Sequence, residues 1–562
     1  MYLLRKRVTV LASLRALCSR TFARVFLLFL FALGPCWLSF GAPVPSMSIG
    51  QNFTGGSDAN TYATPPDCNG VIGPGYFVEF INGSFTVYNK TNGQSVKSVS
   101  DLHFWSNAGV VLSTDAGVSD PRIIYDPLSQ RWFASMVDFD ANAASGDPSL
   151  ESNDFLLAVS AGSDPRGSWH GFLFQADPDN GTFADFPTLG VDNNAVYLSG
   201  DMFHGETNPV GPSLLSFPKA DLLAATPTIA NRTWFGVMDY DVRGEVLQPA
   251  NCFDGSSSGK ILSVTDIGND SSPHSNLVSF AVQNASGPGA TLTASTFIPT
   301  LPWVVPDSAY LSAPCFAPIQ PDGTGTLQAN EARLSAKVYT VGGILYAVHN
   351  TYFNNHIAIR WYRVRAADNV LLESGTIADP DLDLFFPSIA ANAYGVIVIG
   401  FNGCGISTFI SCYAMAGQTI NGVTTFGSRL LLKSSATSYH DLYEEFGLTD
   451  TSRWGDYSTT SVDPSDLNRF WTIQMFPSDT DVWSMQITEL LTTPQATLTI
   501  KPVGTNVMIS WPILAGFQLQ SATNLASPIL WSNVTQAPQT NGSQASLTLP
   551  ASIGRQFFRL KK

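Results

Sequence analysis

Short apolar runs alternate with polar turns along most of the chain. Within 453–476, the Thr/Ser/Val-rich run 457–462 is broken by Asp463-Pro464, and the apolar run 470–473 follows. β-Branched and aromatic residues favour strands and Asp-Pro favours a turn, so this stretch is predicted to be a β-hairpin. Similar cycles of polar start, strand, turn and strand occur at 119–139, 184–203 and 384–403. The pattern therefore predicts a protein built from repeated hairpins.

Seven such repeats can be followed through the middle of the chain. They start near residues 65, 120, 185, 251, 333, 386 and 453. Four-stranded blades with long loops suit this spacing. We therefore predict an all-β fold, a β-propeller of seven blades (six to eight) over 65–493, with the seventh blade beside the first.

The pattern changes after Thr493-Pro494. Residues 494–562 contain short alternating strands that predict a small β-sandwich, with Trp511 and Trp531 as its core anchors. A chain of 562 residues exceeds one ordinary core, and 44% hydrophobic with 13% charged residues is typical of globular domains. The Gly/Asn/Thr-rich segment 42–64 is expected to be a loosely held leader.

The first 41 residues have the composition of a secretory signal peptide. Residues 5–24 contain six basic residues and no acidic residue, and the apolar run 25–41 follows. This run is short for a membrane span, although an uncleaved anchor is the alternative. Cleavage after Gly41 removes those six positive charges and changes the net charge from −15 to −21. Because an acidic chain is a poor partner for nucleic acid or an anionic membrane, we expect a secreted or cell-surface monomer without a membrane span.

The cysteines do not indicate a metal site. Five cysteines remain after the predicted cleavage, none with the CxxC spacing of a metal site: Cys68, Cys252, Cys315, Cys404 and Cys412. Export permits disulfides, and Cys404 and Cys412 are close enough in sequence to bridge adjacent strand ends. The odd count leaves at least one free thiol, which we expect to be buried.

Charged residues gather at the predicted starts of the innermost strands. In a propeller these starts share one face, so their side chains converge on the mouth of the central channel. We predict a ligand site there, formed by Asp67, Asp120, Arg122, Asp185, Asp254, Arg333, Arg453, Asp456 and Tyr457. Neighbouring carboxylates need arginines, a cation or raised pKa values to offset their repulsion, so Asp120 and Asp456 are candidate Ca²⁺ ligands. The alternative is that these aspartates only cap strand ends.

A second acidic segment lies at 138–154. Its carboxylates offer oxygen ligands for Ca²⁺ at Asp138, Asp140, Asp147 and Asp154. The spacing is not that of an EF-hand or of a calcium-binding repeat, so a solvated loop is the expected structure.

Six motifs carry a resemblance to a known group of proteins. They are PPDCNG (65–70), SDPRIIYDPLSQRWF (119–133), AVSAGSDPRGSW (158–169), DFPTLGVDNNAVYLS (185–199), IRWYRVR (359–365) and RWGDYSTTSVDP (453–464). In the sequences of these motifs and their order along the chain, residues 60–490 resemble a sialidase-like β-propeller group of exported bacterial proteins with no settled activity. The resemblance implies the fold of sialidases but not their chemistry. The tail resembles terminal modules of many secreted bacterial proteins.

Three functions remain open from the sequence. The chain has no HExxH, Walker or dinucleotide-binding motif. A sialidase needs three arginines, a Tyr–Glu nucleophile pair and an aspartic acid, and no glutamate pairs convincingly with Tyr457. We expect a binding or adhesion module that recognises a glycan or another surface ligand at the channel mouth. The alternatives are a glycan-active hydrolase or lyase on the same channel and a protein-interaction scaffold.

Overall fold

The computed structural model describes most of the chain beyond the predicted signal peptide. The described residues are 44–205, 208–265, 274–306, 318–323, 327–329, 332–441, 452–513, 517–541, 544–551 and 554–561. The predicted signal peptide and Cys315 therefore lie outside the described residues. Strands dominate the described part, which confirms the all-β prediction.

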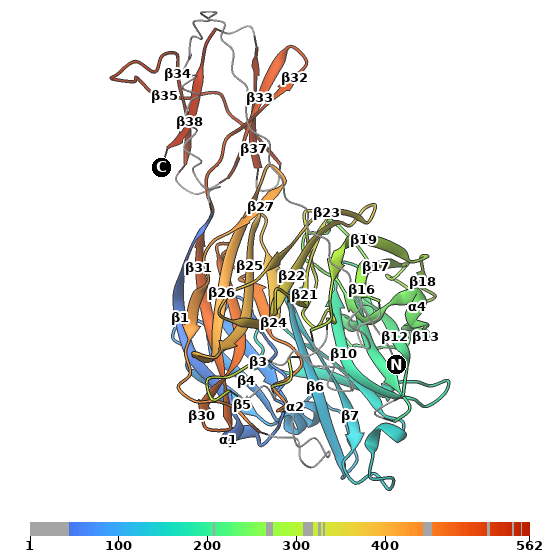
Figure 1. Ribbon diagram of the computed structural model, residues 1–562. Coiled ribbons are helices and arrows are strands. Elements are labelled where there is room, and N and C mark those ends of the chain that lie inside the picture. The colour runs from blue at the N-terminus through green and yellow to red at the C-terminus, as the bar shows by residue number, and fades with distance from the viewer. Residues whose placement is uncertain are drawn as a thin grey trace, which may run out of the picture. The chain divides into compact units, whose positions relative to one another are not determined.

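Seven sheets follow one another along residues 46–493 of the described chain (Figure 1). The first three are β2 (Gly70–Ile72), β3 (Tyr76–Ile81), β4 (Ser84–Asn89) and β5 (Ser95–Val99); β6 (Ala116–Asp126), β7 (Arg131–Asp140), β8 (Asp154–Ser160) and β9 (Trp169–Gln175); and β10 (Phe183–Val191), β11 (Ala195–Phe203), β12 (Pro209–Pro218) and β13 (Thr233–Val237).

The fourth and fifth sheets are β14 (Glu245–Pro249), β16 (Lys260–Val264), β17 (His274–Gln283), β18 (Thr291–Leu292) and β19 (Thr296–Trp303); and β15 (Asn251–Cys252), β20 (Tyr339–Val341), β21 (Ile344–Phe353), β22 (His356–Arg365) and β23 (Val370–Ile377). The last two are β24 (Asp383–Ala391), β25 (Val396–Gly405), β26 (Thr408–Ile420), β27 (Val423–Phe426) and β28 (Leu430–Lys433); and β29 (Thr459–Val462), β30 (Arg469–Asp479) and β31 (Val482–Thr493) with β1 (Ser46–Ser57).

Neighbouring sheets contact one another in succession and return to the first. Strand β2 contacts β6, β6 contacts β10, β10 contacts β14, β24 contacts β29, and β29 contacts β2; the fifth sheet is joined to the fourth by β19 and β23 and to the sixth by β20 and β24. The seventh sheet is also tied to the first by an ion pair between Lys90 and Asp463, at 2.6 Å. This closed succession confirms the β-propeller fold, and we expect each of the seven sheets to form one blade.

A bend marks the start of several innermost strands. Asp120, Phe186 and Phe386 have φ angles of 62°, 49° and 47°, and each directly precedes a proline. The pairing register of the strand shifts at each of these bends. Asp67 and Val246 have matching φ angles of 48° and 49°. A β-bulge re-aims side chains, so these bends determine which side chains face the mouth.

The predicted turns close the hairpins at the opposite ends of the innermost strands, and aspartate side chains stabilise them. The Asp192 side chain accepts a hydrogen bond from the Asn194 backbone N–H at 2.7 Å, and Asp463 accepts one from Ser465 at 2.8 Å. Side chains of this type stabilise turns by bonding to the backbone two residues further on. The hairpins predicted at 119–139, 184–203, 384–403 and 453–476 are confirmed.

The segment expected to be a loose leader is instead part of a sheet. Strand β1 pairs antiparallel with β31, from Ser46 opposite Thr493 to Ser57 opposite Ser484. Met47 and Ile49 pack against one buried cluster and Phe53 against another, so alternate side chains face inward. The expectation was wrong because glycine and asparagine in this strand masked its period of two.

The predicted Cys404–Cys412 disulfide is also wrong. Both thiols are free and buried, as are Cys68 and Cys252. The hairpin register places Cys412 opposite Asn402, whereas Cys404 lies two residues further along β25 and pairs with Asp383. The two sulfurs therefore do not face each other across the strands.

The C-terminal residues form two further sheets. One contains β32 (Thr499–Val503), β33 (Asn506–Pro512), β36 (Gln539–Asn541) and β37 (Gln544–Pro550), and the other contains β34 (Gln518–Ala522), β35 (Ser532–Asn533) and β38 (Phe557–Lys561). Trp511 is buried in the core between them, as predicted. Trp531 is only half-buried and stacks against the Arg559 guanidinium at 4.3 Å, so its predicted core role is wrong. A domain boundary at 494 stays a prediction.

The helices of the described residues are short. They are α1 (Asp58–Thr61), α2 (Asp101–Asn107), the 3₁₀ helix η1 (Pro148–Leu150), α3 (Lys219–Leu222) and α4 (Tyr240–Arg243). Within the described ranges, none is long and apolar enough to cross a membrane.

A buried glutamate holds the closing strand. Both carboxylate oxygens of Glu79, on β3, accept from the Gly56 N–H at 3.0 Å, and the Tyr88 hydroxyl donates to the same carboxylate at 2.8 Å. A Cβ added at Gly55 would lie 2.3 Å from Glu79 Oε1, so glycine is what lets the carboxylate reach the strand. Burial raises the pKa of Glu79 to about 7.

We expect Glu79→Gln to remove a pH dependence of stability. Because the pKa of Glu79 is raised on folding, its contribution is complete below about pH 4.5 and is lost as the pH rises to about 7. Relative to the variant, the parent chain should lose up to roughly 3 kcal/mol of unfolding free energy over that range. Urea unfolding at pH 4.5 and pH 8 measures this difference.

Glu489→Gln is the matched control. Glu489, on β31, accepts from the Gln51 N–H of β1, the strand that Glu79 also contacts, at 2.9 Å. Unlike Glu79, Glu489 also forms an ion pair with Arg469 at 2.7 Å. Its replacement should lower stability at both pH values. An identical pH profile for the parent chain and Glu79→Gln would contradict the assignment.

Candidate functional site

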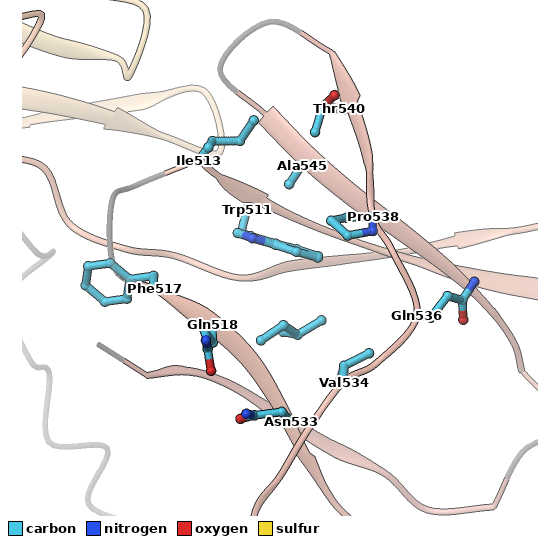
Figure 2. A pocket seen from close by; sticks show the side chains of 11 residues that line it. Trp511, Ile513, Phe517, Gln518, Asn533, Val534, Gln536, Pro538, Thr540 and Ala545 are labelled. Atoms are coloured by element: carbon cyan, nitrogen blue, oxygen red, sulfur yellow. The ribbon is translucent and has the colours of Figure 1, made fainter.

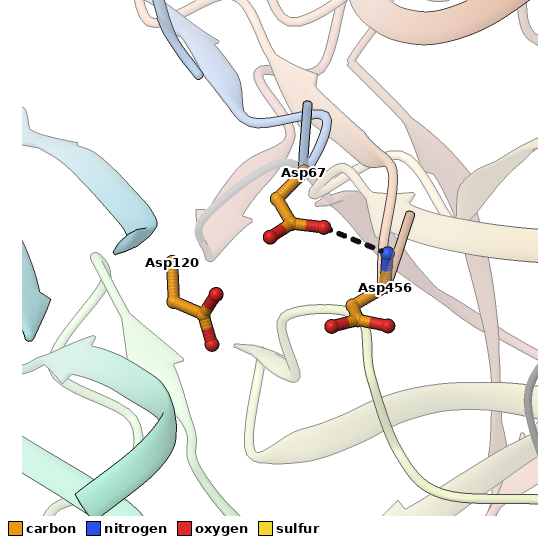
Figure 3. Close-up of side chains that lie close together, drawn as sticks. All are labelled: Asp67, Asp120 and Asp456. Atoms are coloured by element: carbon orange, nitrogen blue, oxygen red, sulfur yellow. Dashed lines mark hydrogen bonds between the residues drawn. The ribbon is translucent and has the colours of Figure 1, made fainter. Parts of the chain in front are cut away.

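Three of the predicted aspartates meet near the starts of the innermost strands of the first, second and seventh sheets (Figure 3). Asp67 precedes β2, Asp120 lies at the bend of β6, and Asp456 precedes β29. One carboxylate oxygen of each lies within 4.8 Å of the others. Asp67 and Asp120 are buried, whereas the side chain of Asp456 is 13% exposed. The cluster is therefore reached from the side of Asp456.

Hydrogen bonds fix these carboxylates between neighbouring sheets. The Asp456 N–H donates to Asp67 at 3.0 Å, the dashed line in Figure 3. Asn82 donates from its amide to Asp67 at 2.9 Å and accepts from the Asp120 N–H at 3.0 Å. Asp120 in turn accepts from the Phe186 N–H at 3.0 Å. The capping role considered from the sequence is therefore present, and it positions the carboxylates.

Burial and mutual repulsion disfavour three ionised carboxylates in this cluster. Burial, and then the charges of Asp456 and Asp120, hold the pKa of Asp67 well above its ordinary range. Burial and the charge of Asp456 also raise the pKa of Asp120, against hydrogen bonds from Asp67 and Ser119. A proton shared between Asp67 and Asp120 relieves this repulsion when no cation does.

Arginines offset part of the charge from the rim. Arg453 lies 3.3 Å from Asp456 and donates to the Gln328 side chain at 2.6 Å. Arg333 lies over the Phe186 ring, 4.6 Å from its centroid. The mouth thus offers anionic and cationic groups side by side.

Asp185 and Asp201 extend the acidic surface over the third sheet. They lie directly opposite each other on β10 and β11. Asp185 is exposed. Asp201 is buried and accepts from the Val246 N–H at 3.2 Å. Burial raises the pKa of Asp201 to about 6.

Sequence reasoning missed Asp201 and Asn82. Asp201 could have been found by counting outward from the turn at 192–194, since that register places it opposite Asp185. Asn82 lies in the Asn-Gly turn between β3 and β4, and an Asn-Gly pair by itself indicates only a turn. Its bonds to the Asp67 carboxylate and the Asp120 backbone N–H depend on contacts that local sequence does not specify.

Arg122 and Tyr457 lie deeper in the ring. The Arg122 guanidinium sits 3.4 Å from the Tyr457 ring centroid and donates to the carbonyls of Pro187 and Ser335 at 2.7 and 3.2 Å. The Tyr457 hydroxyl donates to the Pro121 carbonyl at 3.0 Å. Burial holds the pKa of Tyr457 well above its ordinary value, so this hydroxyl is poorly suited to act as a nucleophile.

Polar side chains cross the centre of the ring near Arg122. Lys337 donates to the Ile123 carbonyl at 2.5 Å and to Asn69 at 3.2 Å, and Gln248 donates to the Leu334 carbonyl at 2.6 Å. All three of these side chains are buried. Gln248 is on β14, whereas Asn69 and Lys337 come just before β2 and β20, so these bonds link segments next to different sheets.

Asp254 does not belong to this site. The fourth innermost strand starts at Glu245, not near Asn251 as expected, so Asp254 follows its far end. There it is exposed and accepts from the backbone of Gly342 at 2.7 Å and Ser256 at 2.9 Å. The prediction failed because the bend at this sheet, at Val246, carries neither aspartate nor proline.

The acidic segment 138–154 does not gather its carboxylates. Asp138 accepts from the Asp154 N–H at 2.7 Å, Asp140 from Asn142 at 2.9 Å, and Asp147 from Ser149 at 2.9 Å. Within the described ranges, the group placed to hold a metal ion is Asp67, Asp120 and Asp456.

No protein-family model matches this chain, and no curated protein matches it in sequence. Solved structures are similar at low level. A protein of unknown function from Dyadobacter fermentans is 9% identical with a TM-score of 0.31, over 68% of this chain and 97% of that one. The polysaccharide lyase Uly1 is 12% identical with a TM-score of 0.36, over 76% and 90%. A Trypanosoma rangeli sialidase mutant with trans-sialidase activity is 10% identical with a TM-score of 0.31, over 77% and 82%. Similarity at this level does not transfer function.

Asp201→Asn and Asp254→Asn should shift stability in opposite directions at pH 7. The asparagine oxygen at 201 can still accept from Val246, and it removes a carboxylate whose pKa burial raises to about 6. That carboxylate costs stability as the pH rises from about 4 to 6, by at most roughly 3 kcal/mol. Burial alone would raise the pKa of Asp254. Hydrogen bonds to its carboxylate, of which the one from the Gly342 N–H contributes most, outweigh burial and lower that pKa.

Thermal unfolding at pH 4 and pH 7 measures both effects. Asp201→Asn should unfold above the parent temperature at pH 7, because it removes a carboxylate with a raised pKa. Asp254→Asn should unfold below the parent temperature, because a carboxylate with a lowered pKa stabilises the fold above that pKa. Equal destabilisation by both variants at pH 7 would contradict the assigned environments.

Proposed function

We propose that this protein is a binding module in which Asp67, Asp120 and Asp456 hold a Ca²⁺ ion at the channel mouth and present it to a glycan. The observation that supports this most directly is the meeting of three carboxylate oxygens within 4.8 Å. Calcium binds oxygen at about 2.3–2.6 Å, so oxygens on opposite sides of one ion are up to roughly 5 Å apart. The observed spacing fits this coordination.

Charge balance favours a cation at this position. Each of the three carboxylates comes from a different part of the chain, and two of them are buried. A shared proton cancels one charge and Arg453 offsets another, at 3.3 Å from Asp456. A divalent cation would offset the repulsion of all three at once.

The open side of the cluster supports a ligand with several hydroxyl groups. Calcium takes six to eight oxygen ligands, so three carboxylates leave coordination places unfilled. Asp456 is partly exposed and Asp185 is exposed, so those places face the outer side of the mouth. Neighbouring hydroxyls of a sugar can occupy two such places, and the rim arginines can donate hydrogen bonds to its other oxygens.

A sialidase-like hydrolase is less well supported. Arg122 is 2% exposed and donates to main-chain carbonyls, so it is not placed to bind the carboxylate of a substrate at the mouth. The Tyr457 hydroxyl donates to a carbonyl and keeps its proton. Binding without turnover therefore agrees best with the geometry, and the scaffold function has no specific contact in its favour.

Calorimetric titration of Ca²⁺ into the chain from residue 43 tests the metal site. The parent protein, stripped with EDTA, should bind one ion, and Asp120→Asn/Asp456→Asn should weaken binding at least about tenfold, or 1.4 kcal/mol. Asparagine at 120 can still accept from Phe186, so the fold should survive. Asp254→Asn is the control and should bind like the parent. Equal binding by the double variant, or no binding by the parent, would contradict the proposal.

Glycan binding is tested separately with the same proteins. Array binding that is lost in EDTA and in the double variant supports calcium-dependent recognition. Release of reducing sugar would instead support the hydrolase, and capture of one protein partner without glycan binding would support the scaffold.

A further inference from the structure

A second candidate site lies wholly within the C-terminal module. A pocket of about 450 Å³ opens between the two sheets of residues 499–561 (Figure 2). This volume falls within the roughly 300–1,000 Å³ of small-molecule sites. Its walls come from β33, β34, β35, β36 and β37 and from the segments that connect them.

The lining combines an apolar floor with an uncharged polar rim. Trp511, Leu519 and Ala545 are buried at the floor. The polar side chains that line the pocket are Gln518, Asn533, Gln536 and Thr540. None of the eleven lining residues carries a charge.

The rim groups are available to a ligand. Gln518, Gln536 and Thr540 are exposed, and within the described ranges no protein group hydrogen-bonds to their side-chain polar atoms. The side-chain oxygen of Asn533 accepts from the Gln520 side-chain amide at 2.9 Å, which leaves the side-chain N–H groups of Asn533 for other acceptors. Amides and a hydroxyl can both donate to and accept from sugar hydroxyls.

We propose that this pocket binds a neutral oligosaccharide segment. A sugar ring has apolar C–H faces that suit an aromatic surface and hydroxyl groups that suit amides, and the pocket offers both. The lining contains no basic side chain, so the pocket offers no ion-pair partner to the carboxylates of an acidic polysaccharide. The lining also lacks carboxylates, so binding here does not need calcium and does not depend on the function proposed for the mouth.

Affinity electrophoresis of the chain from residue 43 tests the pocket directly. Gels containing a neutral polysaccharide (a β-glucan, a galactomannan or a xylan) should retard the protein in the presence of EDTA, and gels containing alginate or polygalacturonate should not. Phe517→Ala and Gln536→Ala should each weaken retardation about tenfold, equivalent to about 1.4 kcal/mol. Trp511 is left in place because it also belongs to the core of the module.

Two controls separate this site from general effects. Leu530 lies in the same module outside the pocket and is 82% exposed, so Leu530→Ala should be retarded like the parent. Asp120→Asn/Asp456→Asn should also be retarded normally, because it alters only the channel mouth. No retardation by any neutral polysaccharide, retardation by the acidic gels alone, or equal retardation of Phe517→Ala, Gln536→Ala and the parent would overturn the proposal.

Discussion

The hydrogen bond from the Asp456 backbone to the Asp67 side chain joins the seventh sheet to the first, at 3.0 Å. It requires a buried carboxylate at the seam of the ring. Asn82 and Asp120 continue the chain of contacts into the second and third sheets. A buried carboxylate costs free energy unless hydrogen-bond donors replace its lost water. The arrangement of the first, second, third and seventh sheets at the mouth therefore depends on these few bonds.

The same constraint makes the mouth chemically distinct. Residues that bend a strand at positive φ have their side chains re-aimed, and here two of them are aspartates, Asp67 and Asp120. Capping and ligand binding are therefore compatible roles for one side chain. A carboxylate has about four lone-pair sites, so Asp120 can accept from Phe186 and still offer an oxygen to a cation.

Local pattern was sufficient to predict the hairpins and the Asp and Asn turns. The run from Tyr457 to Ile473 forms the expected strands because β-branched and aromatic residues surround a strong turn. Strand β1 was missed because three glycines, at 50, 55 and 56, interrupt its alternation. Those glycines allow Glu489 and Glu79 to approach the strand, a long-range requirement that sequence windows do not contain.

The candidate site was predictable only as far as each strand start could be located. Asp120 and Asp456 stand in clear motifs, so they were found. Asp254 was misplaced because the true start at Glu245 has no proline, and Asn82 was missed because its role exists only between sheets. Register between sheets is set by tertiary packing, which propensity does not encode.

The most direct test of a calcium site at the mouth is diffraction from crystals of the chain from residue 43 soaked in Tb³⁺, an ion that replaces Ca²⁺ and scatters anomalously. A calcium site there predicts one strong anomalous peak within about 2.3–2.6 Å of oxygens of Asp67, Asp120 and Asp456. A peak at another site, or a mouth with no peak and a hydrogen-bonded Asp67–Asp120 pair, would contradict it.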